Sequence, residues 1–267
     1  MRTLLTAEQF RHIWRRAGGD TIHLPIQAPS RGRMVSDRDR IGAELNAWWD
    51  ANEDPDLYAA VRGLRQSPSW LQLAGFPVGG KPIRALLGAG GGEGGVGSAV
   101  LAVQDATQAV RDGDNPDWYT DTAVDSAGWS LERGGDIRLG VGHPATLVGE
   151  MMAVVPEFQE GTSPALRADS PGPDAAYTTR ASTTSRSERI AGLLGRRRTQ
   201  HGILSASVAD GAGLREIARV SWVDVAGDGG YLVHEDGPLS LKPAAHRELV
   251  AAARELLASV EAVPGVV

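Results

Sequence analysis

Residues 201–225 read His201-Gly-Ile-Leu-Ser-Ala-Ser-Val-Ala-Asp-Gly-Ala-Gly-Leu-Arg-Glu-Ile-Ala-Arg-Val-Ser-Trp-Val-Asp-Val225, and this stretch decides the fold. Its first nine residues read as a β-strand, and the Asp-Gly-Ala-Gly that follows reads as a turn, because Asp-Gly tolerates a positive φ. From Leu214 onwards, side chains alternate between the two faces of a second strand, with Val220 and Trp222 on one face. The pattern predicts an antiparallel hairpin.

Further strands and a helix follow this hairpin. Gly227 to Gly230 reads as a turn into a strand over 231–234, and a short strand follows at 239–241. Pro243 suits the first turn of a helix, where its missing N–H costs nothing, and residues 244–260 carry one apolar stripe: Leu249, Ala252, Ala253, Leu256 and Val260. We therefore expect a meander from Gln200 to Leu257 closed by a helix, with Trp222 largely buried against that helix.

The same region resembles the C-terminal end of the EspG family, the ESX (type VII) secretion-associated proteins of actinobacteria. Ser221-Trp-Val-Asp224 before Tyr231-Leu-Val233 is its most specific part, followed by Lys242-Pro-Ala244 and a helix ending in Arg254-Glu-Leu-Leu257. Upstream, the Ala-Val-Gln ending of the 99–104 strand and the Ser30-Arg-Gly-Arg33 link between two helices also resemble the family.

The resemblance implies a fold and a function. EspG-like proteins have a central antiparallel sheet flanked by helical bundles. They act as cytosolic chaperones and specificity factors that hold secreted PE–PPE heterodimers, helical bundles with a hydrophobic tip, and keep them soluble until export. A glycine-rich loop at 88–97 and a polar excursion at 106–128 have no match in the family pattern.

Composition is consistent with this expectation. The 267 residues include 42% hydrophobic and 22% charged residues, enough to bury a core, and the net charge of −6 argues against a general nucleic-acid binder. There is no cysteine, and hence no disulfide or thiolate site. No apolar run approaches the roughly 20 residues that span a bilayer, and no signal-peptide core precedes Glu8, so we expect a cytoplasmic protein.

The N-terminal part reads as helices and then strands. Thr6 and Gln9 form a capping box for a first helix, Ser36 caps a second, and Pro55 opens a third. Strands are expected at 69–76, 83–87, 99–104 and 129–141, and Pro144 opens a helix that ends before Pro156.

The chain is expected to be a single α+β domain over 1–267 with a repeated plan. Leu139-Gly-Val-Gly-His-Pro-Ala145 before one helix echoes Leu239-Ser-Leu-Lys-Pro-Ala244 before the other. We therefore expect two helix–meander–helix halves, 1–158 and 185–267, which contribute to one predominantly antiparallel sheet. The Ser-, Thr-, Pro- and Gly-rich stretch at 159–184 reads as a mobile linker between them.

Two patterns raise alternative chemistries. The loop at 88–97 contains G-x-G-x-x-G, which would suit a nucleotide-cofactor enzyme, but a strand follows it and Glu93 lies where a phosphate would bind, which favours a simple strand–strand loop. The six histidines form no metal-binding pair, and Asp210, Asp224, Asp228 and Asp236 lie at turns, where aspartate is common. We expect no cofactor, metal or catalytic site.

The expected partner surface lies in the C-terminal half. Arg196-Arg-Arg198 is the one dense basic spot, which suits a helix C-terminus, an acidic partner or nucleic acid, the last as a regulatory binding module. The resemblance places the client surface on the sheet and the C-terminal helical half. Within that half, we expect Arg196, Arg197, Gln200 and His201 to form a polar rim, with Leu204 as an apolar floor.

Overall fold

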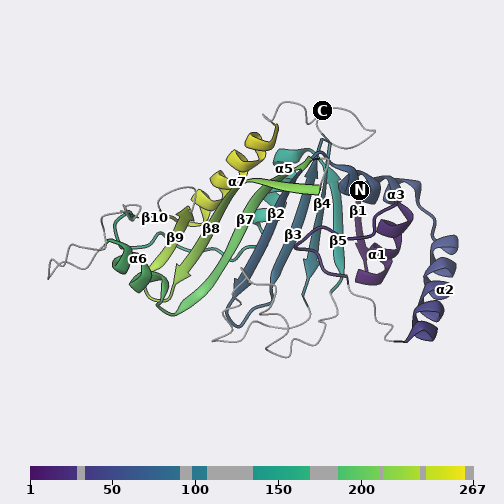
Figure 1. Ribbon diagram of the computed structural model, residues 1–267, viewed down its shortest axis with the longest axis horizontal. Coiled ribbons are helices and arrows are strands. Elements are labelled where there is room, and N and C mark those ends of the chain that lie inside the picture. Colours follow the sequence, from purple (N-terminus) through teal and green to yellow (C-terminus); the bar gives the residue numbers. More distant parts are fainter. Residues whose placement is uncertain are drawn as a thin grey trace.

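The computed structural model describes residues 1–28, 34–90, 98–106, 135–168, 186–210, 213–234 and 239–261. Its centre is a ten-stranded sheet in the order β1-β5-β4-β3-β2-β7-β8-β9-β10-β6 (Figure 1). Every neighbouring pair of strands runs antiparallel. The expectation of an α+β fold built on a large antiparallel sheet is therefore confirmed.

The N-terminal half supplies five adjacent strands: β1 (Arg2–Leu5), β2 (Ser69–Pro77), β3 (Ile83–Ala89), β4 (Ala99–Asp105) and β5 (Ile137–Gly142). Strands β2 to β5 form a meander, in which each strand pairs with the next one in sequence. Strand β1 pairs with β5 and so forms one edge of the sheet.

The C-terminal half supplies the other five: β6 (Leu166–Arg167), β7 (Arg198–Asp210), β8 (Gly213–Val225), β9 (Gly229–His234) and β10 (Ser240–Pro243). Strands β7 to β10 form a second meander, and β6 pairs with β10 at the outer edge. The two meanders meet where β2 pairs with β7, from Ser69 opposite Val208 to Pro77 opposite Gln200.

Two helices cover one face of the sheet. Helices α5 (Pro144–Met152) and α7 (His246–Glu261) pack against the strands of both halves and against each other. The core beneath them includes Leu71, Leu204 and Trp222 of the sheet with Leu249 of α7, and Trp222 is only 1% exposed. Trp222 is therefore buried in the cluster that contains the C-terminal helix, as its strand position predicted.

The other face carries helices at its two ends. Helices α1 (Ala7–Arg16) and α3 (Pro55–Gln66) cover the N-terminal strands, and α6 (Arg186–Leu194) covers the outer C-terminal strands. Helix α2 (Val35–Ala51) lies outside α1 and buries only Ile41 and Trp49 (Figure 1). The Thr6–Gln9 capping box of α1 forms as expected: the Gln9 N–H donates to Thr6 Oγ1 over 3.2 Å, and the Thr6 N–H donates to Gln9 Oε1 over 2.9 Å.

Two local expectations were wrong. Pro243 does not open the last helix: it ends β10 opposite Tyr231, and α7 begins at His246. Proline is tolerated there because β6 pairs only with Ser240 and Leu241, so Pro243 lacks a second neighbour that would need its N–H. Helix α2 begins one residue before Ser36, at Val35. The strand expected at 129–141 is present from Ile137 onwards, and residues 129–134 of it lie outside the described residues.

The expected linker at 159–184 is partly an ordered sheet segment. Residues 159–168 bind the C-terminal meander: the Gly161 N–H donates to Gly230 O over 2.9 Å, and the Ala168 N–H donates to Leu239 O over 2.8 Å. Strand β6 lies within this segment. Residues 169–185, the loop residues 91–97 and residues 107–134, which include all but the first residue of the expected 106–128 excursion, lie outside the described residues.

Each half runs in the order helix, four-strand meander, helix. In the first half these elements are α3, β2 to β5 and α5, and in the second they are α6, β7 to β10 and α7. This is the expected element order. That the halves are structural repeats of each other stays a prediction.

Candidate client-binding surface

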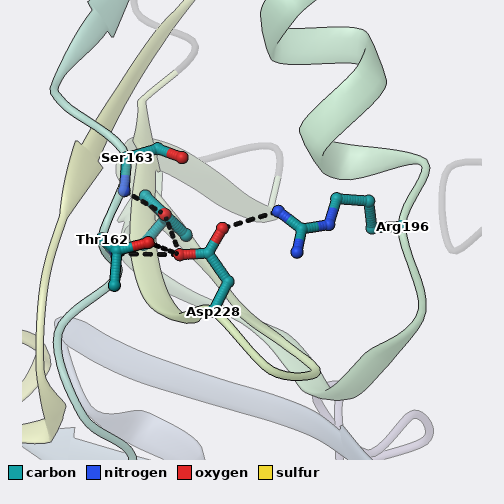
Figure 2. Close-up of polar contacts among 5 residues, drawn as sticks. Thr162, Ser163, Arg196 and Asp228 are labelled. Carbon is teal, nitrogen blue, oxygen red and sulfur yellow. Dashed lines mark hydrogen bonds and ion pairs between the residues drawn. The ribbon is translucent and has the colours of Figure 1, made fainter.

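Arg196 joins a polar cluster around Asp228, in the turn between β8 and β9 (Figure 2). Its guanidinium donates to Asp228 Oδ2 over 2.7 Å, while the other carboxylate oxygen accepts from Thr162 N, from Thr162 Oγ1 and from the Tyr231 hydroxyl at 2.7 to 2.8 Å. The Ser163 N–H donates to the Tyr231 hydroxyl. The cluster therefore ties three segments together: 162–163, the β8–β9 region and the chain after α6.

The Asp228 carboxylate is held ionised by this cluster. Its side chain is 3% exposed, whereas its partner Arg196 is 47% exposed. The hydrogen bonds from Thr162, followed by those from Tyr231 and Arg196, lower the pKa of Asp228 well below its ordinary range, and burial opposes them only in part. Arg196 thus has a structural partner, and its interaction with Asp228 accounts for its position.

The other expected rim residues do not form one surface. Gln200 is 4% exposed and its amide donates to Pro156 O over 2.8 Å, on the face that α5 and α7 cover. Leu204 is fully buried in the core on that same face. The expectation that Gln200 is an exposed rim donor and Leu204 an accessible floor was therefore wrong. The alternation that places Leu204 in the core was visible, but the sequence did not indicate which face the helices cover.

His201 lies on the opposite face and is also buried. Its ring stacks on Phe76 with centroids 5.3 Å apart and an interplanar angle of 27°. Burial, with a smaller effect from Arg198, lowers the pKa of His201 to about 4, so the ring is neutral at physiological pH. Of the five predicted residues, Arg196 and Arg197 are exposed, and they remain the accessible part of the prediction.

A second candidate surface lies on the same face as His201, in the middle of the sheet. We call it the central strand face: Gln72, Ala74 and Phe76 of β2, Ile203 and Ser205 of β7, and Arg219 of β8. The register places Gln72, Ser205 and Arg219 in one row across the three strands, and Ala74 and Ile203 in the next. Because alternate residues of a strand share a face, all six side chains lie opposite the α5–α7 side.

The central strand face combines apolar side chains with a polar network. Ala74, Phe76 and Ile203 are each partly exposed. The Ser205 and Ser207 hydroxyls contact Gln72 Oε1 at 3.3 and 3.1 Å.

The rim of the face is both apolar and charged. The Gln72 amide donates to Leu24 O over 2.7 Å, and the Leu24 side chain is 66% exposed. On β8, the Arg219 guanidinium donates through two nitrogens to the Glu216 carboxylate, each at 2.8 Å. The surface can therefore offer apolar contact together with fixed hydrogen-bonding groups.

The helices leave this strip partly open. Within the described residues, α3 packs on β3 and β4, and α6 packs on β6 and β8, on either side of the β2–β7 pair. The signal in the sequence was the polar character of Gln72, Ser205 and Ser207 at alternating positions of strands whose other face is strongly apolar. Such alternation is typical of a sheet with one face in contact with water, although Ser205 and Ser207 themselves are buried here.

The glycine-rich loop joins two antiparallel strands. Ala89 pairs with Ala99, and the Gly90 N–H donates to Ser98 O, so the loop residues 91–97 lead from β3 directly into β4. The element after the loop is a strand, as expected. Among the described residues, no three His, Cys, Asp or Glu side chains are grouped closely enough to hold a metal ion.

Comparison with known proteins identifies the fold and the family of this chain. The structure of the type VII secretion system chaperone EspG5 from Mycobacterium tuberculosis, in complex with a PE25–PPE41 dimer, matches with a TM-score of 0.59 over 96% of each chain. At 11% identity, this likeness establishes the fold. The model of the EspG family matches residues 6–255, and the chain therefore belongs to the EspG family.

Two further observations complete the comparison. No curated protein sequence matches this chain. A search of the described residues for a helix both long and apolar enough to cross a membrane finds none.

Proposed function

We propose that this protein is a cytosolic chaperone and specificity factor of type VII secretion, which binds a secreted PE–PPE-type heterodimer and keeps it soluble for export. Membership of the EspG family is the observation that carries the proposal. The similar fold of EspG5, whose structure is a complex with a PE25–PPE41 dimer, supports the class of client. The role requires binding and release, and no bond chemistry.

We assign the central strand face to the client. A chaperone for a hydrophobic helical tip needs apolar contact area with a polar border, because burial of the tip drives binding and the border excludes wrong partners. Partly exposed Ala74, Phe76 and Ile203, together with exposed Leu24, supply the apolar area. Gln72 and Arg219 supply the border.

The experiment is co-expression with PE–PPE pairs from the same genome, followed by co-purification. Ile203→Lys puts a charge in the middle of the central strand face and should abolish capture while the protein remains folded. Leu4→Lys makes the same kind of change on the edge strand β1, at a side chain that is 60% exposed, and should capture normally. If no pair co-purifies with the wild type, the proposed client class is wrong. If Ile203→Lys captures as well as Leu4→Lys, the assigned surface is wrong.

We further infer that the two halves are copies of one helix–meander–helix plan. The matching order of elements supports this inference, as do the Pro-Ala dipeptides at residues 144–145 and 243–244, which lie near the start of α5 and α7. Superposition of the two meanders tests it, since unrelated meanders would differ in the placement of their closing helices.

A further inference from the structure

A cavity of about 420 Å³ lies between α1 and α2, outside the surface assigned to the client. Arg11 and Arg15 reach it from α1, where residues four apart share one helix face. Arg38 reaches it from α2, and the described residues that line the cavity include no carboxylate. Three guanidinium groups from two helices therefore converge on one space of a size typical for small ligands.

The groove gathers positive charges beside one carboxylate, that of Glu8. Burial, followed by the repulsion of Arg15 and then of Arg38, lowers the pKa of Arg11, and Glu8 offsets this only in part. The His12 ring also lines the cavity, and its buried Nε2 atom has no hydrogen-bond partner in the part of the chain that the structure describes. The arrangement thus places like charges together where an anion would relieve their repulsion.

The floor of the groove comes from α2 and contains a glycine. Ile41 and Gly42 are adjacent, and Leu45 lies about one helical turn further along α2. A Cβ atom built on Gly42 would meet nothing within 4 Å. Glycine in the middle of a helix costs stability compared with almost any other residue. At this position it keeps the groove open.

We propose that this groove binds a small phosphorylated molecule with two or more phosphate groups, held by Arg11, Arg15 and Arg38. Arginine forks match phosphate oxygens in paired hydrogen bonds, and three cations balance the charge of a diphosphate. The volume of the cavity and the convergence of the arginines from two helices favour a compact small molecule over an extended acidic peptide, which would need a track of cations along the surface. Because α2 buries only Ile41 and Trp49, such a ligand would also fix α2 against α1.

The test is calorimetric titration with inorganic pyrophosphate at constant ionic strength. The wild type should bind at one site. Arg15→Gln should weaken binding at least about tenfold, which corresponds to about 1.4 kcal/mol. Gly42→Glu should weaken it as strongly, because the added carboxylate fills the groove and pairs with the arginines, while the substitution favours the helix. Arg40→Gln removes the same charge from the outer side of α2, where Arg40 is 64% exposed and paired with Glu44, and should bind like the wild type.

Three outcomes would overturn the proposal. One is the absence of saturable binding by the wild type at millimolar pyrophosphate. Another is equal weakening in Arg15→Gln and Arg40→Gln, which would mean that pyrophosphate responds only to net charge. The third is tighter binding of an aspartate-rich peptide of matched charge, with the same dependence on Arg15, which would make the groove a protein-binding site. A rise in melting temperature with pyrophosphate, lost in Gly42→Glu, gives an independent readout.

Discussion

A single carboxylate holds together three parts of the chain that are remote in sequence. Asp228 accepts hydrogen bonds from Thr162, Tyr231 and Arg196, and its side chain is almost fully buried. The contribution of this carboxylate to the stability of the fold depends on its charge, because hydrogen bonds to an ionised acceptor are roughly twice as strong as neutral ones. Its effect should therefore be visible as a dependence of stability on pH.

Asp228→Asn should destabilise the protein by about 1–3 kcal/mol at neutral pH, because the substitution removes the charged acceptor of Arg196. The pKa of Asp228 is lower in the folded state than its ordinary value of 3.8, so the carboxylate stabilises the fold above that value and the effect is lost as pH falls below it. Denaturant titrations at pH 7 and at about pH 3 check this.

The difference in the free energy of unfolding between the wild type and Asp228→Asn should be smaller at pH 3 than at pH 7. Glu44→Gln, at a side chain that is 61% exposed, is the control and should show little effect at either pH. If this difference in the free energy of unfolding did not change with pH, the charge of Asp228 would not contribute to stability.

Trp222→Ala should destabilise the protein by about 3–5 kcal/mol, the usual range for an emptied aromatic core site. Trp222 is 1% exposed, and an added Cβ at Gly202 on the neighbouring strand would overlap its ring, so the site is closely packed. Chemical denaturation gives the value. A loss below about 1 kcal/mol would contradict the burial of the ring.

Among the elements, β6 and the segment that leads to it are the least expected. Residues 159–168 carry the composition of a linker, yet they contain β6, the strand at the outer edge of the sheet. Gly161 permits this, because a Cβ at that position would overlap the Tyr231 ring. Close approach of the backbone to Tyr231 is what brings Thr162 and Ser163 to their partners.

Gly161→Ala should detach this segment from the meander. Amide hydrogen exchange should become faster at Ala168, whose N–H donates to Leu239 O, and remain slow in β3 and β4. Gly149→Ala in α5 is the matched control, because an added Cβ there meets nothing within 4 Å, and it should leave exchange unchanged or slower. Unchanged protection at Ala168 in Gly161→Ala would mean that the segment tolerates the side chain.

The sequence predicts most of the central strands and the helices, but not the short strands at the two edges of the sheet. Strands such as β2 and β8 alternate over many residues, and Thr6 and Gln9 mark a helix start by local hydrogen bonds, so short-range rules suffice. Strands β1 and β6 have four and two residues and exist only because β5 and β10 pair with them. Pro243 followed the helix rule in sequence but lies in a strand, because tertiary pairing decided its position.

The candidate site shows the same limit. Gln200 and Leu204 are close to Arg196 along the chain, but the twofold alternation of a strand and the coverage by α5 and α7 bury both of them. The central strand face combines residues from β2, β7 and β8, which no local pattern brings together. Its polar side chains were visible in sequence, whereas their juxtaposition required the strand order.

At the scale of the molecule, two neighbouring surfaces are proposed for the client, one at Arg197 and one on the central strand face that β2, β7 and β8 share. Exposed Arg197 precedes β7, and the central strand face lies further along the same strand. We expect Arg197→Glu to weaken client capture without a change in melting temperature, because an exposed substitution normally shifts stability by only about 0.5 kcal/mol. Pull-down of the heterodimer beside a melting curve checks this, and unchanged capture would restrict the interface to the central strand face.

The pairing of β2 with β7 has a consequence for synthesis. Its partners lie more than 120 residues apart, with the rest of the first meander and all of 107–185 between them. At the usual 5–20 residues per second, a ribosome needs roughly ten seconds to make β7 after it completes β2. During that interval, one edge of β2 has backbone groups without their final partner, on a strand with the apolar residues Trp70, Leu71 and Leu73. This member of the EspG family would therefore itself pass through a stage at which other chaperones could recognise it.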